Sequence, residues 1–216
     1  MNTSVATNSP AFASNPLLPR VDYGRASFDV THAAVINATY DLPFGRGRFA
    51  SSRALVQKLI DGWQVSGIQT VQSGVPFTPQ LSYNPSNDGD TRNPVRPSVN
   101  PNFVGSVIEG GPNQYFNPNA FIQPLPGTYG NAGRNTLRGP GLVTTDLSFA
   151  KKFVLTERMD LRFRAEFFNL LNHTNFNTPN PVVFAAATGE ASPTAGVITS
   201  TATTSRQVQF GLKLVW

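Results

Sequence analysis

Cysteine is absent from this chain of 216 residues, which excludes disulfide bonds, thiolate metal sites and cysteine nucleophiles. Charged residues are scarce as well: they make up 13% of the sequence, about half of the roughly 25% found in globular domains. The formal net charge is +5, and the basic residues are scattered, so no nucleic-acid-binding surface is predicted. The chain therefore carries too little charge for a typical soluble surface.

Long apolar runs are missing too. No stretch of about 18 apolar residues occurs, which excludes a transmembrane helix. The polar residues 1–10 contain no apolar core of the kind that a secretory signal peptide requires. Glycine and proline, in contrast, number 18 each, so turns and irregular segments must be frequent.

The main signal that is present is a hydrophobic period of two. It is clearest from Met159 to Phe167, where one set of alternate residues is apolar and the other is charged. Successive side chains of an extended strand point to opposite faces, whereas a helix would mix the two sets. We therefore predict a strand with a charged row on one face. This row consists of Asp160, Arg162, Arg164 and Glu166.

Four further strands are predicted from the same alternation, over residues 143–155, 207–216, 28–42 and 61–73, with a helical turn near 54–59. The apolar residues of 143–155 and 159–167 are all odd-numbered. Directly opposed residues share a face, so these two strands require an odd number of residues between them. We predict a three- or five-residue connection around Thr156 to Arg158.

The connections alternate between short and long. Residues 75–141 and 173–205 form long loops rich in Asn, Pro and Gly, and such loops are uncommon inside compact soluble domains. Bacterial outer-membrane barrels have short periplasmic turns and long extracellular loops. The order of connections puts every long loop on one side and the C-terminus on the other. We predict an all-β antiparallel meander of about five long strands from a transmembrane barrel.

No catalytic, cofactor-binding or metal-binding residue is predicted. Ser148 and Lys151 match the S-x-x-K pattern of penicillin-binding proteins, but positions i and i+3 of a strand point to opposite faces. Asn87, Asp88 and Asp90 lack the spacing of a calcium loop and are interpreted as a solvated turn. The two histidines, His32 and His173, have no ligand-spaced partner.

The C-terminus ends in alternate apolar residues followed by a terminal aromatic residue. This pattern resembles the insertion signal by which outer-membrane barrels engage the barrel-assembly machinery. Its physical sense is that the last strand has an exposed edge able to pair with another sheet. The residues that fill the pattern are Val208, Phe210, Leu212, Leu214 and Trp216.

Several stretches, in the same order along the chain, resemble the terminal barrel of Oar-like TonB-dependent receptors. They cover most of the chain from about residue 20 onward, and agreement in order is more specific than any single stretch. The stretches are YDLPFGRG (40–47), GWQVSGI (62–68), QSGVPF (72–77), YGNAGRN (129–135), LRGPG (137–141) and RAEFFNLLNH (164–173).

This resemblance implies a barrel of about 22 strands with an N-terminal plug, which takes up a scarce nutrient with energy from the TonB complex. Five strands would leave two open edges, which hydrocarbon does not tolerate. We therefore expect a fragment whose Met1 is not the true start of the gene product. Residues 1–26 would be an extracellular loop or the start of the fragment, and residues 27–216 the C-terminal barrel segment. The missing plug and strands would be its partners, together with outer-membrane lipid and an unknown small ligand.

In such a barrel the charged row would line the lumen, and the apolar residues of the central hairpin would face lipid. The long loops would form part of an external mouth for the ligand. The residues expected to face lipid are Leu147, Phe149, Leu161, Phe163 and Phe167. Two alternatives remain open: a soluble all-β module that binds a ligand such as a carbohydrate, and a hydrolase on a β scaffold. Both predict a protein that dissolves without detergent.

Overall fold

The computed structural model describes residues 13–15, 17–44, 52–89 and 95–216, and its chain divides into two compact units. Unit 1 comprises Met1–Thr31, Ser73–Gly141 and Phe176–Ala202, and unit 2 comprises His32–Gln72, Leu142–Asn175 and Thr203–Trp216. Asp90 and part of the predicted segment 1–26 lie outside the described residues. Each unit is built from sequence segments that are far apart.

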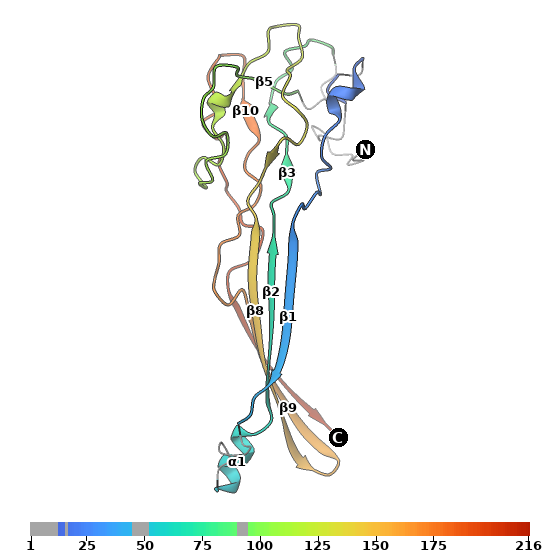
Figure 1. Ribbon diagram of the computed structural model, residues 1–216, viewed down its shortest axis with the longest axis vertical. Coiled ribbons are helices and arrows are strands. Elements are labelled where there is room, and N and C mark those ends of the chain that lie inside the picture. Colours follow the sequence, from blue (N-terminus) through green and yellow to red (C-terminus); the bar gives the residue numbers. More distant parts are fainter. Residues whose placement is uncertain (1–12, 16, 45–51, 90–94) are drawn as a thin grey trace. The chain divides into compact units, whose positions relative to one another are not determined.

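Unit 2 is a sheet of five antiparallel strands, which confirms the all-β prediction. Its strands lie side by side in the order β1-β2-β8-β9-β11, with β1 and β11 at the two edges (Figure 1). Each has at least the roughly 9 residues that a tilted membrane-spanning strand needs. The bounds are β1 Ala33–Asp41, β2 Trp63–Gln72, β8 Leu142–Thr156, β9 Met159–Phe168 and β11 Gln207–Val215.

The register of the sheet follows from the alternation of apolar residues. Leu147 lies opposite Phe167, Phe149 opposite Ala165, and Leu212 opposite Phe163. A slip of one residue would place apolar side chains opposite charged ones along the whole hairpin. The hydrophobic pattern therefore fixes which residues pair.

The β8–β9 hairpin departs from the predicted connection. Two residues, Glu157 and Arg158, separate the strands, so the prediction of three or five is wrong. The apolar residues of the two strands nevertheless share one face, as predicted, because the register shifts between Val154 and Thr156. This bulge takes up the extra residue within β8 instead of within the turn.

The first strand is shorter than the predicted 28–42, because β1 begins at Ala33. The preceding chain turns, with the Asp29 amide donating to the Ala26 carbonyl at 3.0 Å. Arg138 fixes this turn through its Nη2, which lies 2.7 Å from the Asp29 carboxylate and also donates to Thr31. The Arg138–Asp29 ion pair therefore holds the chain in a turn just before β1. The alternation of apolar residues alone extends the strand back to residue 28.

The helix α1, Ala54–Ile60, lies in the β1–β2 connection, close to the predicted helical turn. It lies at the same end of unit 2 as the β8–β9 turn and the C-terminus, and we call this the turn end (Figure 1). At the opposite end, the loop end, the chain enters and leaves the segments of unit 1. No helix in the described part of the chain is both long and apolar enough to cross a membrane.

Unit 1 combines the N-terminal segment with most of the two predicted long loops, and these loops enclose a hydrophobic core. Its strands have two or three residues and form three small pairs: β3 with β7, β4 with β10, and β5 with β6. Short 3-10 helices, η1 Pro19–Asp22 and η3 Pro118–Ala120, begin at prolines. The strand bounds are β3 Pro76–Phe77, β4 Gln80–Leu81, β5 Ser98–Val99, β6 Phe121–Ile122, β7 Leu137–Arg138 and β10 Val182–Phe184.

The core of unit 1 is centred on Phe116, which is fully buried. Its ring lies 5.9 Å from that of Phe77 and 6.2 Å from that of Phe121, the latter edge-to-face. Val183 and Phe184 complete the centre from the second long loop. The loops are therefore ordered by long-range aromatic packing and not by regular secondary structure.

Candidate membrane interface

One face of the unit 2 sheet is apolar across all five strands. The register puts the even-numbered residues of β1 and β11 on the same face as the odd-numbered residues of β2, β8 and β9. This face is open: Ile36, Phe210 and Leu212 are 67%, 69% and 68% exposed. We call it the apolar face. It contains every residue that the sequence predicts to face lipid, and Val208, Phe210, Leu212 and Leu214 of the predicted insertion signal.

Aromatic rings join neighbouring strands on the apolar face. Phe149 on β8 and Phe167 on β9 meet edge-to-face, with ring centroids 6.0 Å apart. Phe163 on β9 stacks on Phe210 of β11 at 6.3 Å. Ala165 lies between Phe149 and Phe210 and is buried. In this row a small residue lies between two large ones, so their side chains pack across the strands of the apolar face.

Lys151 is the cation on the apolar face, and the structure explains how it is accommodated there. Its Nζ donates to the backbone carbonyl of Asp61 at the turn end. The same atom lies 4.9 Å from the Phe153 ring and 5.5 Å from the Trp63 ring. The lysine stem therefore lies along apolar surface while aromatic rings and a main-chain oxygen surround the charge.

A second polar contact on the apolar face joins Thr145 of β8 to Gln69 of β2, which lie directly opposite each other. The threonine hydroxyl donates to the glutamine Oε1 at 2.6 Å. A polar group placed in hydrocarbon is costly unless it is hydrogen-bonded. This hydrogen bond satisfies part of the hydrogen-bonding capacity of each side chain. The alternation pattern of the strands alone does not reveal it.

The opposite face carries the predicted charged row. Asp160 Oδ2 lies 2.8 Å from Arg162 Nε, and Arg164 Nη1 lies 3.4 Å from Glu166 Oε1. Both pairs lie along β9, two residues apart and therefore on one face. The predicted row thus forms two ion pairs on what we call the polar face.

Three cations lie side by side across the polar face. Arg162 of β9 is directly opposite Lys152 of β8 on one side and Lys213 of β11 on the other. Asp160 contacts two of them, with its Oδ1 3.5 Å from the Lys152 Nζ. Like charges in directly opposed positions destabilise a sheet. A cavity of about 600 Å³ on unit 2 is lined by all three cations.

The predicted insertion signal lies on β11, which pairs with β9 along one side and forms a sheet edge along the other. Trp216 follows β11 at the turn end and is 87% exposed. The hydrogen-bonding groups along such an edge are able to pair with another strand. Engagement of the assembly machinery by this strand stays a prediction.

Buried asparagines hold the loop end of unit 2, and sequence reasoning missed them. Asn175 accepts from the Val143 amide at 2.7 Å and donates to its carbonyl at 2.9 Å, as a neighbouring strand would. Asn169, with a positive φ of 49°, donates to the carbonyls of His173 and Thr204. The only sequence signal was the density of Asn in the RAEFFNLLNH stretch and just after it.

No group of three or more potential metal ligands occurs among the described residues. His32 immediately precedes β1, and His173 Nδ1 lies 3.1 Å from Asn175 Oδ1. Ser148 and Lys151 lie on opposite faces of β8, as predicted from the spacing in a strand.

An antiparallel sheet with one open apolar face and one charged face is the arrangement found in the wall of a membrane β-barrel. Residues 1–209 match the family model of the outer membrane beta barrel domain. This match covers almost the whole chain, so the protein belongs to that family and is located in the outer membrane of a Gram-negative-type bacterium. No significant match was found among curated proteins or among solved structures.

Proposed function

We propose that the chain is the C-terminal barrel portion of a TonB-dependent receptor of the Oar-like type, which takes up a scarce nutrient. The observation that carries this proposal is the exposed apolar face of unit 2, continuous over five antiparallel strands. Lipid hydrocarbon would cover such a face, as it covers the outer wall of a membrane barrel. The sequence stretches from YDLPFGRG to RAEFFNLLNH occur in the same order as in the terminal barrel of Oar-like receptors. This resemblance favours that receptor type over other outer-membrane barrels.

In this proposal the apolar face contacts lipid, and the polar face lines the lumen. The cations Lys152, Arg162 and Lys213 would then meet the plug or water. Residues 75–141 and 173–205, which both connect strands at the loop end, would lie on the outside and contribute to ligand capture. The five strands supply part of a wall and are not competent for transport by themselves, because their two edges require further strands.

The soluble ligand-binding alternative requires a cover for the apolar face. A sandwich would bury this face against a second sheet. Phe210 and Leu212 instead remain more than half exposed among the described residues. The geometry therefore favours the membrane proposal over a carbohydrate-binding module.

The first test is to read the DNA immediately upstream of the Met1 codon. We expect an open frame that encodes further amphipathic strands, a plug and a signal peptide. A stop codon close upstream, with a ribosome-binding site before Met1, would overturn the receptor proposal.

A second test addresses energy coupling. The gene is disrupted in its host, and growth is compared with iron, cobalamin, a saccharide or a peptide as the limiting nutrient. We expect slow growth on one of these, reproduced when the TonB complex is lost and not worsened when both are lost. A growth defect that is independent of TonB would contradict the proposal.

A further inference from the structure

A cavity of about 630 Å³ lies within unit 1. This volume is in the range of roughly 300–1,000 Å³ typical of small-molecule sites. Three arginines and one carboxylate contribute to its lining, together with two aromatic residues. These six residues are Arg20, Asp22, Tyr23, Arg25, Phe28 and Arg134.

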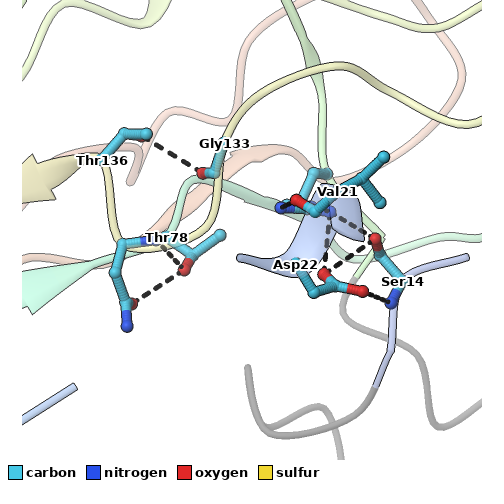
Figure 2. Close-up of polar contacts among 8 residues, drawn as sticks. Ser14, Val21, Asp22, Thr78, Gly133 and Thr136 are labelled. Atoms are coloured by element: carbon cyan, nitrogen blue, oxygen red, sulfur yellow. Dashed lines mark hydrogen bonds and ion pairs between the residues drawn. The ribbon is translucent and has the colours of Figure 1, made fainter. Parts of the chain in front are cut away.

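The one carboxylate of this lining is already engaged. Asp22 accepts hydrogen bonds from the Ser14 amide at 2.9 Å and from the Ser14 hydroxyl at 3.1 Å (Figure 2). It also forms an ion pair with the buried Arg96, with Oδ1 2.9 Å from Nη2. Burial lowers the pKa of Arg96, and the Asp22 carboxylate acts in the opposite sense. Asp22 therefore serves to stabilise Arg96, leaving the lining arginines without a counterion from this residue.

Arg134 is the distinctive residue of the cavity. It is 7% exposed, and its Nη2 is buried without a hydrogen-bond partner among the described residues. Buried arginines are normally paired, because desolvation of a guanidinium is costly. The adjacent Asn135 fixes the backbone beside it: the Asn135 amide donates to the hydroxyl of the buried Thr78 at 2.9 Å. Arg134 thus lines the cavity with a largely buried side chain whose charge has no partner at Nη2.

The aromatic residues of the lining, unlike the buried Arg134, are largely exposed. Tyr23 is 93% exposed and Phe28 is 74% exposed, although both lie beside a cavity. Exposed rings next to guanidinium groups suit a ligand that has an apolar or planar body and an anionic group. None of these residues belongs to unit 2, so the site is separate from the apolar and polar faces described above.

We propose that this cavity binds a small organic oxyanion, namely a carboxylate or a phosphate ester attached to an aromatic group. Arg134 attracts the oxyanion through its poorly solvated positive charge in the wall, Arg20 and Arg25 contribute further positive charge, and Tyr23 and Phe28 contact the ring. The proposal does not rest on transport, because binding at this site requires neither the TonB complex nor a closed barrel.

Binding is measured by equilibrium dialysis of the full chain in detergent micelles, with labelled benzoate and phenyl phosphate as probes. Benzyl alcohol, which keeps the ring without the charge, and acetate and inorganic phosphate, which lack the ring, are the matched controls. We expect at least one aromatic anion to bind more tightly than the neutral ring and than the ringless anion of its own class. Preference for benzoate or for phenyl phosphate then identifies the oxyanion. Equal binding of benzyl alcohol, or no binding of either anion, would overturn the proposal.

Variants locate the site. Arg134→Gln should weaken binding by on the order of tenfold or more, because a partly buried positive charge beside the oxyanion is lost. Arg158→Gln removes one exposed positive charge from the β8–β9 turn and should leave affinity unchanged. If Arg134→Gln does not fold, the double variant Arg20→Gln/Arg25→Gln, both exposed positions, replaces it. An equal loss of affinity in Arg158→Gln, or full affinity in the folded Arg134 or double variant, would contradict the assignment.

Discussion

The two units treat apolar side chains in opposite ways. In unit 1, Phe116 is fully buried at the centre of a core that short strands and irregular loops enclose. In unit 2, Phe210 is 69% exposed on a sheet whose strands have nine to fifteen residues. Ala165 is the one buried hydrophobic residue among the described part of unit 2.

This difference indicates two different solvents. Full burial of a large apolar side chain contributes about 1.5–3 kcal/mol, and unit 1 obtains this within its own chain. Unit 2 forms its hydrogen-bonded ladders but leaves its apolar face for an external apolar phase to cover. A compact loop domain and a membrane-spanning sheet thus occur in a single chain, interleaved along the sequence.

The largest expected effect comes from emptying the core of unit 1. Phe116→Ala should destabilise unit 1 by about 3–5 kcal/mol, because it removes a fully buried ring and leaves a cavity. Hydrogen exchange of the Phe121 and Val183 amides in detergent measures this loss. Phe210→Ala is the matched control and should leave exchange in unit 1 unchanged. Equal effects of the two variants would contradict the division into two environments.

A charge on the apolar face tests the other half of the comparison. Phe210→Arg should cost about 2–4 kcal/mol near the bilayer midplane, whereas Gln209→Arg, on the opposite face of the same strand, should cost far less. Urea titration of the expressed gene product folded in lipid vesicles measures the difference. A similar cost for both variants would mean that the apolar face does not contact lipid.

The asparagine at the loop end offers a smaller effect that is confined to unit 2. Asn175→Ala leaves the amide and carbonyl of Val143 without their side-chain partner, at a cost of about 1–3 kcal/mol. Faster exchange of the Val143 amide is the expected result. Asn177→Ala, at an exposed position, serves as the control, and identical exchange in the two variants would argue against this bracing role.

The three adjacent cations of the polar face allow a stabilising change. Lys213→Glu places a carboxylate directly opposite Arg162 and should raise stability by roughly 0.2–1 kcal/mol. Lys213→Gln removes repulsion without adding attraction and should give an intermediate urea midpoint. A lower urea midpoint for Lys213→Glu than for the parent would contradict this prediction. It would indicate another negative charge close to position 213.

The smallest effect concerns the Arg138–Asp29 ion pair in the turn before β1. A hydrogen bond from Arg138 lowers the pKa of Asp29 below its usual value. A lowered folded-state pKa means that the stabilisation is complete above the unfolded value of about 3.9 and is lost as the pH falls through the lower folded value. An NMR titration of the Asp29 carboxyl should show this shift, and Arg138→Gln should reduce it, because Arg138 is its largest cause. An unchanged titration in the variant would remove Arg138 as the cause.

The sheet was predictable from sequence because its information is local. Alternation along Met159 to Phe167 identifies a strand and its two faces, and the same parity identifies its partners. The bulge near Leu155 was not predictable, because a shift of register within β8 and a longer turn preserve the same parity. The late start of β1 depends on Arg138, which is distant in sequence.

The core of unit 1 and its cavity were not predictable for a related reason. Phe77, Phe116 and Val183 belong to separate loop segments without periodicity, so nothing local indicates that they meet. Arg134 likewise joins Arg20 and Arg25 only after folding. Long-range packing determines both the core and the cavity, and the Pro- and Asn-rich composition of these segments does not indicate that packing.

The direction of the edge strands constrains any closed assembly. In the antiparallel order β1-β2-β8-β9-β11, the first and last strands run the same way. A ring of identical sheets joined edge to edge would therefore contain parallel seams, which bacterial outer-membrane barrels do not use. An uninterrupted antiparallel wall instead requires an odd number of additional strands, whatever its final circumference. The arithmetic of strand direction thus favours a dissimilar partner over self-assembly.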